Sequence, residues 1–411
     1  MKIYLITFSP TPKRMESIYE CHKELLLEIE KYFTVHLIPY TQADSIPANA
    51  YKMAFIASGG VEHLVERCFS MMPYPITLLA DGLSNSLAAS MEIAAWIRSK
   101  NMQAQIIHGS VKDMALQILL HHKAFAAKRS LKGKRIGVIG YPSQWLIASH
   151  TDYLLVQQRW GVNYIDIQIE EVYELFNSIT DDEIGVEASI FANDAQACRE
   201  GTPEDLLKAM RVYKSIRKLC DKYQLNALTL SCFEMIEKLG TTGCLALSLL
   251  NNEGIPAGCE GDLQSIMTLL MMKELTGQAG FMCNLSNVDI HKNEIIAGHC
   301  SIPTKMTYAY IIRNHYETQC GISIQGLLHE GDITLVKCGG ECLDEFFISN
   351  GRIIENTNFE NMCRTQIRVK LDNPVNYFLQ NPLGNHHILL LGHHEREITE
   401  FMKQNNCKPR S

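Results

Sequence analysis

The sequence lacks several features that mark common classes of protein. It contains no run of 18 apolar residues, so we expect no membrane-spanning segment and no membrane partner. Lys and Arg total 38 against 45 Asp and Glu, a net charge of −7, and no basic stripe occurs, which argues against nucleic-acid binding. The N-terminal stretch 1–10 has no small-residue cleavage site. We therefore expect it to form a first strand of a cytoplasmic protein.

Paired cysteines are also missing. The 14 cysteines are scattered singly and form no Cys-x-x-Cys motif, and Cys338 and Cys342 are the closest two. A zinc ribbon needs two close pairs at set spacing, so this pattern does not predict one. We expect reduced thiols that are mostly buried and behave as small apolar side chains.

A complete nucleotide-binding fingerprint is absent as well. Ser58-Gly59-Gly60 follows a short apolar run and could form either a phosphate loop or a tight turn, and the turn is the simpler interpretation. Gly137 and Gly140 resemble the start of a dinucleotide site, but the third glycine is missing. Neither stretch predicts a nucleotide cofactor on its own.

What is present indicates an α/β protein with more than one domain. A chain of 411 residues with 46% hydrophobic and 20% charged residues can bury a normal core in two or three domains. Strand-like and helical patterns alternate as far as about residue 290, which indicates βαβ units and parallel sheets. Closely spaced strands then predict a β-rich barrel or sandwich. We place the domains at 1–130, 131–290 and 291–411.

Polar residues that could carry chemistry lie at the ends of apolar runs in the second half of the chain. Glu260 and Asp262 flank Gly261, and Asn284, His299 and the pair His386-His387 follow later runs. Carboxylates, an amide and imidazoles suit Mn²⁺ or Mg²⁺ better than Zn²⁺. The alternative is structural, since an acid at a helix N-terminus is favourable through the helix dipole alone. Glu234 also follows a strand, where it could act as a catalytic acid or cap a helix.

Several segments resemble the L-fucose isomerase / L-arabinose isomerase superfamily, and in particular its shorter, fucose isomerase-like proteins. The segments are Cys259-Glu260-Gly261-Asp262, Phe281-Met282-Cys283-Asn284, His299-Cys300-Ser301-Ile302-Pro303, Cys363-Arg364-Thr365 and Gly384-Asn385-His386-His387. The resemblance covers most of the chain. It implies two Rossmann-like, doubly wound domains followed by a β-barrel-like C-terminal domain, and a homo-oligomer (a trimer or hexamer) whose sites neighbouring subunits complete.

The resemblance also implies an activity and a set of site residues. The activity is the interconversion of an aldose and a ketose, a monosaccharide or a derivative, through an enediol with Mn²⁺. Glu260 would be the first metal ligand, and either His386 or His387 the last, with His387 favoured. Asn284 stands where the family has a second acidic ligand that also acts as an acid or base.

That asparagine is a departure from the family pattern. A neutral amide can bind a cation through its oxygen but carries no proton, and loss of a proton carrier costs about 10²–10⁴ in rate unless another group replaces it. Asp262, Glu234 or His299 could do so. We expect Glu260 to be the base, with Asp262 or His299 moving the hydroxyl proton.

The remaining alternatives concern the substrate and the reaction. Arg364 could bind an anionic group of the substrate, although a structural ion pair is the simpler role. Because the acid/base set differs from that of the family, an aldol-type cleavage or an epimerisation in the same pocket is an alternative reaction. A non-catalytic sugar-binding protein is the alternative from another class.

Overall fold

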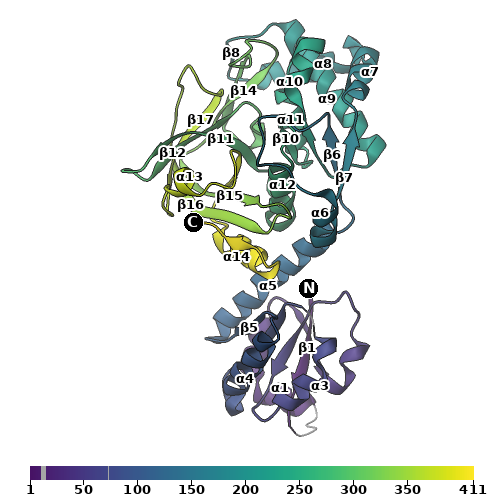
Figure 1. Cartoon of the computed structure of the whole chain (residues 1–411), viewed down its shortest axis with the longest axis vertical. Coiled ribbons are helices and arrows are strands. Elements are labelled where there is room, and N and C mark those ends of the chain that lie inside the picture. Colours follow the sequence, from purple (N-terminus) through teal and green to yellow (C-terminus); the bar gives the residue numbers. More distant parts are fainter. Residues whose placement is uncertain (11–14, 73) are drawn as a thin grey trace. The chain divides into compact units, whose positions relative to one another are not determined.

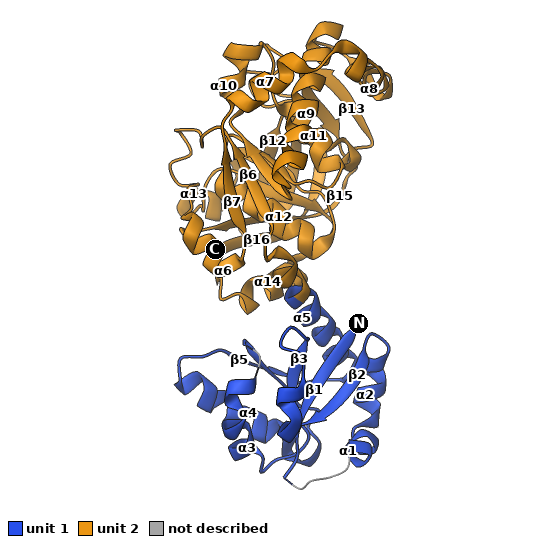
Figure 2. Ribbon diagram, turned by 90° about the vertical axis from the view of Figure 1, so that its right-hand side faces the viewer, with its two compact units in different colours: residues 1–125 blue, residues 126–411 orange. Residues whose placement is uncertain are grey.

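The computed structural model describes residues 1–10, 15–72 and 74–411. The chain divides into two compact units, Met1–Phe125 and Ala126–Ser411 (Figures 1 and 2). The predicted fold class is confirmed: parallel sheets carry helices, and an antiparallel barrel follows them. Where the three predicted domains begin and end remains a prediction.

Unit 1 is built on a five-stranded sheet in the order β2-β1-β3-β4-β5, in which every neighbouring pair is parallel. Alternate residues of the strands enter two separate cores, as the period of two in a strand requires. Its strands are β1 (Lys2–Phe8), β2 (Thr34–Pro39), β3 (Lys52–Ile56), β4 (Ile76–Leu79) and β5 (Ala104–Ile107). Its helices are α1 (Met15–Cys21), α2 (Lys23–Glu30), α3 (Glu62–Arg67), α4 (Ser86–Ser99) and α5 (Val111–Leu131), the last of which continues into unit 2.

Unit 2 begins with a second parallel sheet, in the order β10-β9-β6-β7. Its strands are β6 (Arg135–Ile139), β7 (Asn163–Ile167), β9 (Ala227–Leu230) and β10 (Ala257–Cys259). The accompanying helices are α6 (Tyr153–Trp160), α7 (Glu170–Ser178), α8 (Asp181–Asp194), α9 (Pro203–Tyr223), α10 (Cys232–Leu239), α11 (Cys244–Asn252) and α12 (Leu263–Thr276).

The rest of unit 2 is a closed barrel of six antiparallel strands. Their order is β15-β18-β11-β12-β17-β16, and β16 pairs back with β15 to close the ring. They are β11 (Phe281–Asp289), β12 (Glu294–His299), β15 (Gly331–Gly339), β16 (Glu345–Asn356), β17 (Thr365–Leu371) and β18 (His387–Leu391), and β19 (Lys408–Pro409) joins β16 outside the ring. The barrel region also holds α13 (Tyr377–Gln380) and α14 (Glu395–Gln404), and a small sheet orders β14 (Ser323–Leu327), β13 (Ala309–Arg313) and β8 (Ala197–Cys198).

Helix α12 joins the second sheet to the barrel. Residues on all its sides are buried, because it contacts β9 and β10 as well as β15 and β18. Thr268 anchors it to the barrel: its hydroxyl accepts a hydrogen bond from the backbone N–H of Cys338 at 3.1 Å. The loop that begins α12, residues 260–262, is therefore fixed against the ends of the barrel strands.

Candidate metal centre

The turn between β10 and α12 sets the position of Glu260. Glu260 and Gly261 both have a positive φ, 63° and 70°. A Cβ at Gly261 would lie 2.6 Å from Cα of Pro142, so only glycine fits there. Asp262 then caps α12 by accepting a hydrogen bond from the backbone N–H of Ser265 at 2.7 Å. The carboxylate of Glu260 is thus presented at the carboxyl end of a parallel sheet, a usual place for a site.

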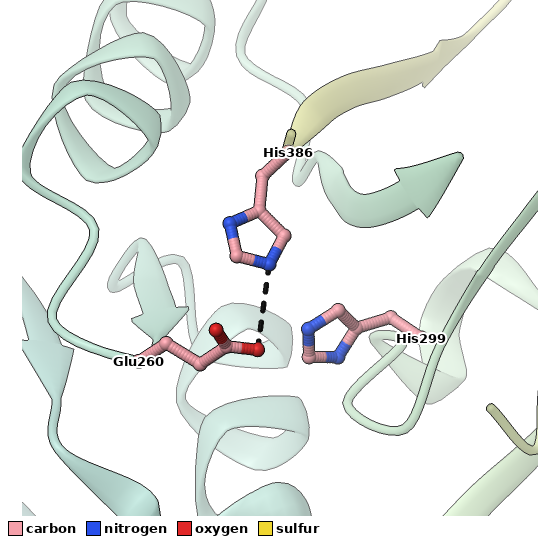
Figure 3. A group of neighbouring side chains, drawn as sticks. All are labelled: Glu260, His299 and His386. Atoms are coloured by element: carbon pink, nitrogen blue, oxygen red, sulfur yellow. Dashed lines mark ion pairs between the residues drawn. The ribbon is translucent and has the colours of Figure 1, made fainter. Parts of the chain in front are cut away.

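Two histidines of the barrel meet this carboxylate. His299 ends β12, and His386 immediately precedes β18. One ligand atom from each of Glu260, His299 and His386 lies within 4.8 Å of the others, and Nε2 of His386 is 3.5 Å from Oε1 of Glu260 (Figure 3). His386 is fully buried and His299 is 4% exposed. The structure therefore gathers three of the residues that the sequence singled out.

Hydrogen bonds on the far side of each imidazole orient its ring. Nδ1 of His386 pairs with Oδ2 of Asp262 at 2.9 Å, and Nδ1 of His299 with the hydroxyl of Ser301 at 3.1 Å. The fully buried Lys337 holds Asp262 in turn, with Nζ 3.7 Å from Oδ2. Nε2 of both histidines is buried and, among the described residues, has no hydrogen-bond partner. Nε2 of His299 is available to a ligand, and Nε2 of His386 becomes available once its proton, which now faces Glu260, is lost.

These contacts shift the proton affinities of the cluster. Burial raises the pKa of Glu260, but the close approach and charge of His386 outweigh it and lower the pKa to about 2. Burial lowers the pKa of His386, yet Asp262 and Glu260 together raise it to about 9. Burial, followed by the charge of His386, lowers the pKa of His299 to about 4. The pKa of Asp262 is lowered, since Lys337 and His386 outweigh its burial.

The donor set fits a divalent cation. One carboxylate and two imidazoles are common ligands of Mn²⁺, Zn²⁺ and iron. The unpaired, buried Nε2 atoms are the observation that supports the fit, because buried polar atoms normally have a partner. The second hydrogen bond of each ring is the usual way in which a protein fixes a histidine ligand. The three residues are therefore a candidate metal site.

A pocket opens beside this site. It encloses about 440 Å³ of empty space, a volume that includes the open solvent at its mouth. Trp145 stands next to it: its indole N–H donates to Oε2 of Glu260 at 2.7 Å, and its ring meets that of Phe233 edge to face at 5.2 Å. The lining consists of Cys232, Phe233, Ile236, Thr242, Cys244, Cys259, Glu260, Asn284, His299, Cys300, His315, Tyr316, Glu317 and Cys363.

The other predicted site residues have different surroundings. Asn284 lines the pocket, and its Oδ1 accepts a hydrogen bond from Asn385 at 2.6 Å. Glu234 accepts a hydrogen bond from the hydroxyl of Ser231 in the first turn of α10. Arg364 is paired with Glu200 at 3.2 Å.

His387 points to the opposite side of β18 from His386. Its ring meets those of Phe347 and Tyr377 edge to face within the barrel core. Burial, followed by the charge of Lys337, lowers its pKa to about 3. Of the two adjacent histidines, the structure brings His386 to Glu260.

Trp145, Lys337 and Ser301 contact the cluster, and sequence reasoning did not single them out for it. Trp145 lies in a loop with no motif, and Lys337 lies in a strand where a lysine normally faces solvent. Ser301 stands in the His299-Cys300-Ser301 segment, so its closeness to His299 in sequence was the one signal that could have indicated it.

The described parts of the chain contain no helix that is both long and apolar enough to cross a membrane. No family model matches the sequence. A structural comparison with D-threo-3-hydroxyaspartate dehydratase from Delftia sp. HT23 covers 97% of this chain and 84% of that one. It gives a TM-score of 0.16 at 12% identity, which carries no information about fold or function.

The curated proteins that are similar to this chain are all named sulfoquinovose isomerase. The chain is 21% identical over 267 residues to the sulfoquinovose isomerase of Priestia aryabhattai, and the match covers 62% of this chain and 58% of that protein. It is 21% identical over 293 residues to the sulfoquinovose isomerase of Alkalicoccus urumqiensis, with 66% of each covered. A shorter match of 143 residues, 27% identical, is to the sulfoquinovose isomerase of Clostridium sp. (strain MSTE9), covering 34% of this chain and 32% of that protein. The chain is thus similar, over roughly three fifths of its length, to proteins named as isomerases of one sugar.

Proposed function

We propose that this protein is a metal-dependent enzyme that interconverts an aldose and a ketose, a monosaccharide or a derivative of one, through an enediol. The observation that carries the proposal is the meeting of Glu260, His299 and His386 beside a pocket, with two buried imidazole nitrogens left unpaired. The names of the similar proteins support the same reaction. We further propose membership of the L-fucose isomerase / L-arabinose isomerase superfamily, on the resemblance of the site segments.

Glu260, His299 and His386 would hold the cation, which we propose to be Mn²⁺, and Asn284 lies on the same pocket wall with its Oδ1 bonded to Asn385. When bound, the cation supplies positive charge beside oxygens that become negative during the reaction. A histidine that binds a metal is neutral, so His386 would give up its proton to become a ligand. The charge of His386 that lowers the pKa of Glu260 would then be lost from the ring, but the positive charge of the cation would act on the carboxylate in its place and keep it ionised.

The residues of the chain would divide the proton transfers. Glu260 is the proposed base that removes the proton from C2 of the sugar, because it is ionised and reaches the pocket. His299 could carry the hydroxyl proton only through Nε2, which is the atom that would bind the cation, so we propose it as a ligand; its ring is neutral near pH 7, as a ligand must be. Asp262 does not line the pocket; it would act by holding His386 in the orientation that points Nε2 at Glu260.

The substrate and the assembly belong to the same proposal. Sulfoquinovose, named in the similar proteins, is the first sugar to test, followed by L-fucose and L-arabinose. Glu234 and Arg364 remain proposed substrate contacts, although the charge of Arg364 is already balanced by Glu200. A homo-oligomer, a trimer or hexamer, is proposed on the resemblance alone, and a cytoplasmic location remains a proposal.

Metal binding can be tested without a substrate. Protein stripped with a chelator is titrated with MnCl₂ while its melting temperature is recorded. We expect a concentration-dependent rise in the wild type, because a ligand that binds only the folded state stabilises it. Glu260→Gln should lose most of that rise, whereas Glu317→Gln, which changes an acid on the same pocket wall, should keep it. A wild type that does not respond to Mn²⁺ would contradict the metal site.

The reaction is tested by proton exchange. The protein is incubated with each sugar and MnCl₂ in D₂O, and deuterium at C2 is followed by NMR together with the appearance of the ketose. Isomerisation through an enediol predicts both. Cleavage of the sugar would identify an aldol-type reaction instead, epimerised aldose without ketose would identify an epimerase, and binding with no exchange or product would identify a sugar-binding protein.

A further inference from the structure

The pocket has an unusual wall, because five of its fourteen lining residues are cysteines. They are Cys232, Cys244, Cys259, Cys300 and Cys363, and all five are free thiols. Buried cysteines normally act as small apolar side chains inside a core. Here they surround a hollow that reaches solvent and that also contains Glu260 and His299. A small polar molecule that enters the pocket therefore meets thiols as well as the candidate metal site.

Two of these thiols lie in direct contact. Sγ of Cys232 is 2.9 Å from Sγ of Cys259. A disulfide has an S–S length of about 2.05 Å, so the two atoms need to approach by only about 0.9 Å. Both residues are 6% exposed or less, which leaves the side chains little room to move apart.

The fold holds this pair together. Cys259 ends β10 and is in register with Leu230 of the neighbouring strand β9. Cys232 begins α10, two residues beyond Leu230, on the same edge of the sheet. The contact thus joins the ends of two hydrogen-bonded parallel strands, and it does not depend on the placement of a flexible loop.

We propose that Cys232 and Cys259 are a redox-active pair that forms a reversible disulfide when a two-electron oxidant such as a peroxide enters the pocket. One thiolate attacks the peroxide oxygen, the O–O bond breaks, and a sulfenic acid and hydroxide form. The second thiolate attacks the sulfenic sulfur and displaces the hydroxyl group. With the thiol protons counted, two thiols and one hydrogen peroxide give one disulfide and two waters.

The pair is connected directly to the candidate metal centre. Cys259 is bonded to Glu260, which already has a positive φ, and the next residue, Gly261, has no room for a side chain beside Pro142. Movement of Cys259 toward Cys232 is therefore passed to Glu260. A displacement approaching 1 Å at a reacting group lowers rates by up to about 10²-fold. This consequence rests on the proposed function, whereas formation of the disulfide does not.

The experiment maps thiols in the full-length chain. Protein is exposed to graded hydrogen peroxide, its remaining thiols are alkylated, and the unreduced digest is analysed by mass spectrometry. We expect a cross-linked peptide joining Cys232 to Cys259, which dithiothreitol removes. Cys232→Ser should abolish that peptide, and Cys198→Ser, which changes an exposed thiol, should leave it intact. The wild-type digest gives the answer even if a variant folds poorly.

Two results would contradict the proposal that Cys232 and Cys259 form a disulfide. Oxidation of exposed Cys21 and Cys198 with Cys232 and Cys259 still alkylated would do so, as would linkage of either residue to Cys244, Cys300 or Cys363. Sugar turnover is measured on the same samples and should fall by about 10-fold to 10²-fold and recover on reduction. A linked but fully active enzyme would overturn the coupling to Glu260. A wild type without turnover under any condition bears on the proposed function alone, because the mapping does not require activity.

Discussion

Each parallel sheet of this protein presents an acid beyond the carboxyl end of a strand, and each acid meets a histidine from another element, but the two pairs are completed differently. In unit 1, Asp81 pairs with His22 at 2.5 Å, and its other oxygen accepts a hydrogen bond from the backbone N–H of Leu83 at 3.1 Å. In unit 2, Glu260 meets His386 at 3.5 Å, and Nε2 of that ring has no hydrogen-bond partner among the described residues.

This difference shows which polar groups remain able to bind a ligand: those whose hydrogen bonds are not all made within the protein. A polar group whose hydrogen bonds are all satisfied within the protein contributes to folding and has little left to offer a ligand. The barrel supplies two imidazoles, His299 and His386, whose outer nitrogens are held by Ser301 and Asp262 and whose inner nitrogens have no hydrogen-bond partner among the described residues. Unit 1 also has a parallel sheet, but both carboxylate oxygens of Asp81 already bond to groups of the protein, His22 and the backbone N–H of Leu83. The following predictions test that contrast.

The largest effect is expected from Glu260→Gln, with Asp81→Asn as the matched change in unit 1. Loss of the base should lower sugar turnover by about 10⁴-fold and remove most of the stabilisation by Mn²⁺. Asp81→Asn should lower the melting temperature, since it weakens a buried charged pair, and keep the response to Mn²⁺. Equal loss of the Mn²⁺ response in both variants would remove the distinction between the two sheet ends.

Lys337→Met should reduce stability by up to about 3–5 kcal/mol, because it removes one of the two cationic partners of the buried Asp262 and leaves only His386 at 2.9 Å. The matched change is Lys134→Met, which breaks a pair with Glu274 at 3.0 Å whose side chains, 23% and 18% exposed, still reach solvent, and it should cost about 1 kcal/mol or less. Urea unfolding of both variants measures the free energies. A cost for Lys337→Met no greater than that for Lys134→Met would show that Lys337 does not support the site through Asp262.

Much of the fold could be predicted from the sequence, because the spacing of apolar residues along the chain indicates where strands and helices form. Strands alternating with helices indicated parallel sheets, and closely spaced strands indicated the barrel that β15 and β16 close. It also found Glu260 and His299, since polar residues that end apolar runs stand out in sequence.

The rest of the site could not be predicted, because it depends on strand register and on contacts between segments far apart in the sequence. His386 and His387 are adjacent, and neighbouring side chains of a strand face opposite ways, so only the register of β18 in the barrel decides which one meets Glu260. Lys337 reads as a solvent-facing lysine until α12 covers it completely. The bond from Trp145 to Glu260 spans 115 residues and has no signal in the sequence.

Acid should destabilise unit 1 through a histidine that is buried without charge. Burial, followed by the charge of His122, lowers the pKa of His121 to about 4, and the ring pairs with the hydroxyls of Tyr51 at 3.1 Å and Thr77 at 2.8 Å. The unfolded chain has the ordinary value of 6.5 and binds the proton first as pH falls. The contribution of neutral His121 to the free energy of unfolding is therefore fully present above pH 6.5. It is lost progressively toward pH 4, by about 3 kcal/mol in total.

Urea unfolding between pH 7.5 and pH 4 measures that loss. His121→Gln, which keeps two hydrogen-bonding groups but cannot be protonated, should flatten the pH dependence in the unfolding of unit 1. His63→Gln changes an exposed histidine of the same unit and should leave the dependence as it is in the wild type. An unchanged slope in His121→Gln would assign the acid sensitivity to other groups.

The smallest effect is expected from Trp145→Phe. Its indole N–H donates to Oε2 of Glu260 at 2.7 Å although 57% of the residue is exposed, so the bond competes with water and is worth about 1 kcal/mol. We expect kcat/KM to fall roughly fivefold. Trp96→Phe, the matched change in unit 1, alters a ring that packs against Phe69 and should change kcat/KM less than about twofold.

The way in which kcat and KM share the loss identifies what Trp145 does. If the indole only orients Glu260 for proton removal, kcat falls and KM stays the same, since the ground-state complex is unaffected. If the ring also packs against the sugar, KM rises as well. A variant with unchanged kcat/KM would mean that the barrel histidines and the turn at Gly261 suffice to orient Glu260. The distinction between the two sheet ends would then depend on buried groups alone.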